Sequence, residues 1–100
     1  MVGKMVQVIN GIVIGNKYKG QWKDNKYDGY GIVYYSNGDI EYEGQWKDYK
    51  KDGYGILYYS NGDKYEGQWK DNKFDGYGIG YYSNGDIYYE GQWKDDKKDG

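Results

Sequence analysis

Apolar and polar residues alternate with a period of two over much of the chain, which is the pattern of half-buried β-strands. In one such segment Tyr42 and Trp46 fall on one side of the strand, and Glu43 and Gln45 fall on the other. A second kind of segment, built around Gly-Tyr-Gly-Ile, occurs three times. Ser-Asn-Gly-Asp follows each copy, and Asn-Gly between β-rich segments is a strong hairpin signal. The pattern therefore predicts a series of β-hairpins.

These segments recur as one repeated unit. Its tryptophans, Trp22, Trp46, Trp69 and Trp93, are separated by 24, 23 and 24 residues. We expect two short antiparallel strands per unit, and the second strands are expected over residues 29–35, 53–59 and 76–82. Successive hairpins would pair edge to edge into an elongated, single-layer antiparallel sheet. This is an all-β fold with little or no helix, in agreement with the absence of Ala and the single Leu.

The repeat divides the chain into an N-terminal segment and four units. Residues 1–17 are expected to form a capping strand or hairpin, because aliphatic residues flank Asn10-Gly11. The units cover residues 18–41, 42–64 and 65–88, and a partial unit covers 89–100. The first and third units carry one more residue than the second between the turn glycine and the next tyrosine. A bulge or a change of register has to absorb that residue.

The paired glycines of the second strands allow two interpretations. Glycine inside a strand leaves room for a close approach, so a Trp or Tyr ring of a neighbouring strand can lie across it. The alternative is that these glycines only relieve strain where the chain leaves a loop. We favour ring packing for all three pairs, Gly29 and Gly31, Gly53 and Gly55, and Gly76 and Gly78.

Composition changes the kind of core that this sheet can have. Leu, Ile, Val and Phe contribute only 15 of 100 residues, whereas there are 16 Tyr and 4 Trp. Each aromatic side chain buries roughly 150–250 Å², so the core is expected to consist of aromatic ladders rather than aliphatic side chains.

The recurring residues resemble the MORN repeat, whose pattern is Tyr-x-Gly-x-Trp, then Gly-x-Gly, then an aromatic residue three positions before a turn glycine. The second unit fills this pattern completely, and the resemblance implies a MORN array of three full repeats and a broken fourth. It also implies the all-β hairpin fold and roles in partner binding, in dimerisation through array ends, and in cytoskeletal and membrane-contact assemblies. The residues that carry the signature are Tyr18, Gly20, Trp22, Gly29, Gly31, Tyr42, Gly44, Trp46, Gly53, Gly55, Tyr65, Gly67, Trp69, Gly76, Gly78, Tyr89, Gly91 and Trp93.

The residues that most enzymes require are absent from this sequence. It has no His and no Cys, so it lacks the usual general base at neutral pH, a thiolate nucleophile and a cysteine-based zinc site. We therefore expect no catalytic residues, no metal site and no cofactor. A net charge of −2 without Arg argues against a nucleic-acid partner. Without a long aliphatic segment, the expected location is the cytoplasm, with association to cytoskeleton or membrane left open.

A possible partner-binding surface lies on the face opposite the paired glycines. Its tyrosines recur in register and are expected to form a continuous aromatic stripe across the sheet, namely Tyr30, Tyr34, Tyr54, Tyr58, Tyr77 and Tyr81. Exposed apolar patches often mark partner surfaces, and Tyr is a favoured anchor there. The alternative is that these tyrosines only stabilise the sheet through cross-strand pairs.

Four functions therefore compete, and the last of them is an aromatic cage that binds choline or a sugar. The first is a non-catalytic scaffold that binds a partner helix or peptide on the aromatic face, with self-association through the open array edges. The second is a module that targets anionic phosphoinositide membranes through the Lys-rich loops, although Asp residues nearly balance their charge. The third is an accessory repeat region of a larger enzyme, such as a phosphatidylinositol phosphate kinase.

Overall fold

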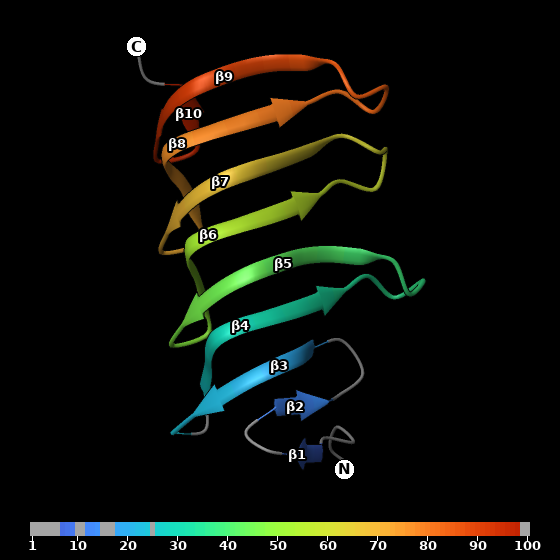
Figure 1. Ribbon diagram of the computed structural model, residues 1–100, viewed down its shortest axis with the longest axis vertical. Helices are drawn as coiled ribbons and strands as arrows, with labels where there is room; N and C mark the ends of the chain where they lie inside the picture. Colours follow the sequence, from blue (N-terminus) through green and yellow to red (C-terminus); the bar gives the residue numbers. More distant parts are fainter. Residues whose placement is uncertain (1–6, 10–11, 15–17, 25, 99–100) are drawn as a thin grey trace.

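A computed structural model describes residues 7–9, 12–14, 18–24 and 26–98, and these residues form one open antiparallel sheet (Figure 1). Its ten strands follow one another in chain order, and no helix is present among the described residues. The molecule measures 45 × 27 × 23 Å. The predicted all-β array of consecutive hairpins is confirmed. The strands are β1 (Gln7–Ile9), β2 (Ile12–Ile14), β3 (Tyr18–Lys23), β4 (Lys26–Tyr34), β5 (Ile40–Lys47), β6 (Lys50–Tyr58), β7 (Lys64–Lys70), β8 (Lys73–Tyr81), β9 (Ile87–Lys94) and β10 (Lys97–Lys98).

The N-terminal hairpin predicted around Asn10-Gly11 is described in its two strands. β1 pairs antiparallel with β2, and β2 pairs in turn with β3, so this hairpin continues the sheet. Val6, Asn10 and Gly11 lie outside the described residues.

Strands β4, β6 and β8 are longer than the sequence predicted, because they begin at Lys26, Lys50 and Lys73 rather than three residues later at glycine. The polar stretch between the two predicted strands is mostly strand, and the loop shrinks to a two-residue turn. Both turn residues have positive φ, for example 51° at Asp48 and 70° at Tyr49. This is the type I′ geometry whose twist suits a β-hairpin.

The Ser-Asn-Gly-Asp turns are also hairpin turns, as predicted, but they have another geometry. The amide of Gly38 donates to the carbonyl of Tyr35, and the amide of Tyr35 donates to the carbonyl of Asp39. Gly38 has a φ of 95°, and Asn37 supplies its side-chain oxygen to the amide of Asp39. This is a three-residue loop that ends in a left-handed glycine, and not the two-residue Asn-Gly turn.

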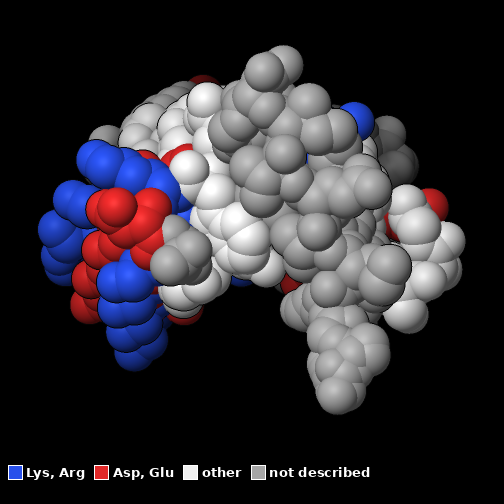
Figure 2. Space-filling model, turned by 90° about the horizontal axis from the view of Figure 1, so that it is seen from below, with Lys and Arg blue, Asp and Glu red and all other residues white. Residues whose placement is uncertain are grey.

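Each long hairpin contains a bulge that bends the sheet. Between β5 and β6, Gly44 pairs with Gly55 and Trp46 pairs with Lys51. From one pair to the other the chain covers two residues in β5 but four residues in β6. Gly53 lies in this bulge with a φ of 101°. Bulges increase local bending and twist. Seen along its long axis, the molecule is an arch (Figure 2).

The aromatic core covers the face that carries the tryptophans. Tyr42 and Tyr65 have no exposed surface, and Trp46, Trp69 and Trp93 are buried, although the sheet has no second layer. Side chains on the inner side of a bent sheet converge, so we assign this face to the inside of the arch. We call it the inner face, and the opposite one the outer face.

The two glycines of each pair have different purposes. A Cβ at Gly55 would lie 2.0 Å from the hydroxyl oxygen of Tyr42. A Cβ at Gly31 or Gly78 would lie 2.2 Å from that of Tyr18 or Tyr65. Ring packing is confirmed for these three glycines. For Gly29, Gly53 and Gly76 it is wrong: their φ values lie between 93° and 104°, and the neighbouring side chain is a glutamine. The left-handed backbone explains glycine there.

A bulge absorbs the extra residue of the first and third units. Val33 pairs with Tyr42 and Tyr34 pairs with Ile40, so Glu41 is the additional residue. Tyr88 has the same place between β8 and β9, and its ring fills the space above Gly80. β6 and β7 pair without a shift at this point, as expected for the shorter second unit.

Candidate functional site

The predicted partner-binding tyrosines lie on the outer face, away from the aromatic core. Tyr30, Tyr54 and Tyr77 are 45%, 47% and 47% exposed. They occupy the same position in β4, β6 and β8 and pair with Gln45, Gln68 and Gln92 of the following strands. We call these three residues the outer tyrosine row.

The expected continuous aromatic stripe is wrong, because a glutamate separates the tyrosines of successive hairpins. Glu43 accepts hydrogen bonds from the hydroxyls of Tyr30 (3.3 Å) and Tyr58 (2.6 Å), which come from the strands on either side of it. Glu66 accepts from Tyr54 at 3.0 Å, and Glu90 accepts from Tyr77. From the sequence alone, these glutamates are recognisable only as residues on the polar side of β5, β7 and β9. The pairing of the strands turns them into part of the tyrosine surface.

The other three predicted tyrosines, Tyr34, Tyr58 and Tyr81, are half-buried. Burial and the hydrogen bond to Glu43 raise the pKa of Tyr58 to about 12. The ammonium group of Lys64 lies 4.9 Å from the centre of the Tyr81 ring and 3.6 Å from a carboxylate oxygen of Glu66. Tyr58 and Tyr81 are thus held in the sheet by these contacts.

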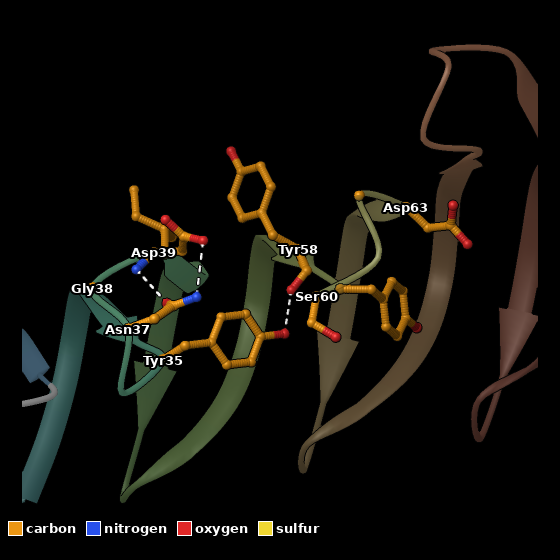
Figure 3. A pocket seen from close by; sticks show the side chains of 10 residues that line it. Tyr35, Asn37, Gly38, Asp39, Tyr58, Ser60 and Asp63 are labelled. Carbon is orange, nitrogen blue, oxygen red and sulfur yellow. Dashed lines mark hydrogen bonds between the residues drawn. The ribbon is translucent and has the colours of Figure 1, made fainter.

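The sequence did not indicate a second group of exposed tyrosines at the Ser-Asn-Gly-Asp turns. A hollow of about 600 Å³ lies between the first two of these turns, where the Tyr35 hydroxyl donates to the carbonyl of Tyr58 (Figure 3). A hollow of about 240 Å³ lies beside Tyr59, Tyr82 and Tyr88. The Tyr-Tyr pair before each of these turns could have indicated this group. Adjacent residues of a strand point to opposite faces, so the two tyrosines of a pair cannot both belong to the outer face.

Lysines gather at the strand ends beside the type I′ turns, on the side of the sheet opposite the Ser-Asn-Gly-Asp turns. We call this side the lysine edge. On the left arm of the arch they are interspersed with acidic side chains (Figure 2). Ion pairs link Lys94 to Asp75 at 3.5 Å and Lys26 to Asp48 at 4.0 Å. Four cross-strand pairs at this edge join lysine to lysine: Lys23 with Lys26, Lys47 with Lys50, Lys70 with Lys73, and Lys94 with Lys97.

The described part of the chain contains neither a cluster of potential metal ligands nor a membrane-spanning helix. No group of three or more acidic side chains there is arranged to hold a metal ion. The same residues include no helix of the length and apolarity needed to cross a membrane.

The geometry defines a class of protein: an all-β repeat protein in which a hairpin unit recurs and each unit contacts its neighbours in the chain. The family model of the MORN repeat matches residues 18–40, 42–64, 65–87 and 89–100, and the chain therefore belongs to the MORN repeat family. The predicted three full repeats and a partial fourth are confirmed. This family is generally a non-catalytic repeat module, and the hairpin sheet fits an interaction module of that kind. The comparison with curated proteins found no match.

Proposed function

We propose that this protein is a non-catalytic scaffold whose outer tyrosine row binds an amphipathic helix of a partner protein. The observation that carries the proposal is the row itself: three tyrosines, each about half exposed, in the same register position of three successive repeats. Because glutamates hold their hydroxyl groups, the rings need little ordering when a partner binds.

The spacing of the row favours a helix over an extended peptide. Successive tyrosines are two strands apart, which is about 9.5 Å at the usual distance between strands. Residues seven apart on a helix lie on one side and are separated by about 10.5 Å. An extended peptide covers a similar distance in three residues, but its side chains then point in opposite directions. A helix lying along the long axis of the sheet can therefore place one apolar side chain beside each tyrosine.

The charges beside the row favour a basic partner. Glu43 and Glu66 lie between the tyrosines, and Glu90 lies beyond Tyr77. Only Glu66 has a lysine within ion-pair distance among the described residues. Lysines or arginines that flank the apolar positions of the helix would reach these carboxylates. Such complementary charges fix the register of a complex.

A synthetic helix of about 20 residues, with leucine at every seventh position and lysines beside it, tests the proposal. We expect saturable binding to the protein in isothermal titration. Replacement of Tyr30, Tyr54 and Tyr77 by Ser should weaken binding at least ~10-fold, since interface anchors contribute more than about 1 kcal/mol each.

The matched control is the double variant Tyr59→Ser and Tyr82→Ser, which removes equally exposed tyrosines from the turn edge. It should bind the helix as the unchanged protein does. Equal loss in both variants, or binding that survives removal of the outer tyrosine row, contradicts the proposal.

A second candidate function, targeting to anionic membranes, is supported by the lysine edge. Like charges directly opposite each other in a sheet reduce stability, so four such pairs at one edge favour a role outside folding. Vesicles with and without a phosphoinositide would be sedimented with the protein at low and high salt. Binding that needs the phosphoinositide, weakens with salt and is lost in Lys50→Glu with Lys73→Glu would support this function. Equal sedimentation with both vesicles would contradict it.

A further inference from the structure

Three repeats contain the same box of three aromatic rings on the inner face, and the residue that fills the box differs. In the third repeat Phe74 is stacked on Tyr65 at 3.9 Å between ring centres, with the edges of Trp69 and Trp93 at 4.8 and 5.0 Å. The first repeat repeats this arrangement: Tyr27 is stacked on Tyr18 at 3.8 Å, with Trp22 and Trp46 beside it.

In the second repeat the box is filled by a lysine. The Nζ of Lys51 lies 5.3 Å from the ring centre of Tyr42 and 5.6 Å from those of Trp46 and Trp69. Tyr42 and Trp69 take the relative orientation that Tyr65 and Trp93 take in the third repeat, with ring centres 5.3 Å apart and planes nearly perpendicular. The walls of the box are therefore the same, and only the ring at its centre is missing.

The lysine can leave this box without disturbing the strand. Its amide donates to Asn72 Oδ1 at 2.8 Å and its carbonyl accepts from the Asn72 amide at 3.0 Å, so the backbone stays fixed. Burial among the rings lowers the pKa of Lys51, with Glu41 and Asp96 acting in the opposite direction. None of the ion pairs within the described residues includes this ammonium group.

We propose that the ring box of Tyr42, Trp46 and Trp69 is a binding site for an aromatic ring that carries a nearby carboxylate, such as an aromatic side chain next to an acidic one. The ring takes the place that Tyr27 and Phe74 take in the neighbouring repeats. The ammonium group of Lys51 moves out of the box and pairs with the carboxylate. This site is on the inner face and is independent of the helix proposed for the outer face.

The probe is 3-phenylpropionate, followed through the indole N–H signals of the four tryptophans in NMR spectra. We expect saturable shifts at Trp46 and Trp69 and little change at Trp93, whose box is filled by Phe74. The variant Lys51→Phe closes the box and should weaken binding at least tenfold, while its thermal unfolding shows that it folds. Lys50→Ala, an exposed neighbour, should bind as the unchanged protein does.

Two further comparisons test the chemistry of the site. Lys51→Ala should still bind the neutral ring p-cresol but lose the preference for 3-phenylpropionate over it. The variant that lacks the outer tyrosine row should bind 3-phenylpropionate normally, so failure of one proposal does not imply failure of the other. Equal shifts at all four tryptophans, unchanged binding by Lys51→Phe, or binding of tetramethylammonium instead of 3-phenylpropionate would overturn the proposal.

Discussion

At Tyr18, Tyr42 and Tyr65 the phenol lies directly over a glycine of the next strand, and the hydroxyl group reaches a backbone carbonyl. The Tyr42 hydroxyl donates to the carbonyl of Gln45 at 3.0 Å, and the Tyr65 hydroxyl donates to that of Gln68 at 2.9 Å. The polar end of each ring is thus satisfied inside an apolar cluster. The outer tyrosines donate to glutamates instead and keep about half of their surface exposed. The face of the strand therefore decides what a tyrosine does here.

The close contact between ring and glycine predicts a large effect of a single methyl group. In Gly55→Ala the new Cβ would lie 2.0 Å from the Tyr42 hydroxyl and 2.4 Å from the ring, so the ring has to move. Overpacking of this kind costs about 1–3 kcal/mol, and chemical denaturation should show the loss.

The control for Gly55→Ala is Gly38→Asn, where nothing lies within 4 Å of an added Cβ and the backbone is left-handed. Asn adopts a left-handed backbone more readily than most other residues, so the loss there should be smaller than in Gly55→Ala. Equal stability of the two variants would mean that the ring contact has no energetic importance.

Buried tyrosines also predict a loss of stability at alkaline pH. Burial raises the pKa of Tyr18, Tyr42 and Tyr65, and raises that of Tyr58 from 10.0 to about 12. In the unfolded chain these phenols lose their protons near pH 10, whereas the folded state retains them. Their contribution is therefore complete below pH 10 and decreases as the pH rises towards 12.

The free energy of unfolding, measured by denaturant titration at several pH values, checks this direction. It should fall steadily above pH 10, and the fall should be smaller in Tyr58→Phe. Stability that stays constant or increases over this range would contradict the raised pKa values of these phenols.

At the scale of the strands and turns, the type I′ turns also connect one repeat to the next. The amide of Asn72 donates to the carbonyl of Lys51, and its side-chain oxygen accepts from the Lys51 amide. Asp96 makes the same two hydrogen bonds to Phe74. The second residue of these two turns thus holds the start of the preceding long strand, in addition to closing its own hairpin.

Removal of this connection should loosen the array at one junction. In Asn72→Ala the Lys51 amide loses its 2.8 Å acceptor, and alanine has to adopt a φ of 70°. Together these changes should cost about 1–3 kcal/mol. Asn72→Asp keeps both the acceptor and the tolerance of a left-handed backbone, so thermal unfolding should be nearly unchanged. An equal drop in both variants would contradict the role of the side-chain oxygen.

The order and pairing of the strands could be predicted from the sequence because glycine, aromatic residues and Asn-Gly recur at fixed distances. The role of Gly53 could not, since its positive φ follows from a bulge that appears only when β5 and β6 are paired. For the same reason Glu43 was not recognised as part of the tyrosine surface: its partners Tyr30 and Tyr58 come from two different strands. Local sequence patterns therefore predict the strands and turns. Which residues share a surface depends on the register of the paired strands, and the local patterns do not fix that register.

At the scale of the whole molecule, the tryptophans of the second, third and fourth repeats are hydrogen-bonded to the repeat before them. The indole N–H groups of Trp46, Trp69 and Trp93 donate to the carbonyls of Gly31, Gly55 and Gly78, each in the preceding repeat. Trp22, in the first repeat, has a buried indole nitrogen that finds no hydrogen-bond partner among the described residues. Stability in such arrays is approximately a sum over neighbouring units. The inner rings supply these connections, and under the proposal made above the outer tyrosines bind a partner.

This division between the two faces is tested most directly by comparing two variants in the same chemical denaturation experiment. One variant replaces all three residues of the outer tyrosine row by Ser, and the other carries only Tyr65→Ser. Loss of a fully buried ring should cost about 3–5 kcal/mol, as for other large aromatic residues. The triple variant should therefore be clearly more stable than the single one, although it lacks three rings. A triple variant as unstable as Tyr65→Ser, or less stable, would show that the outer tyrosines hold the sheet together and would contradict this account.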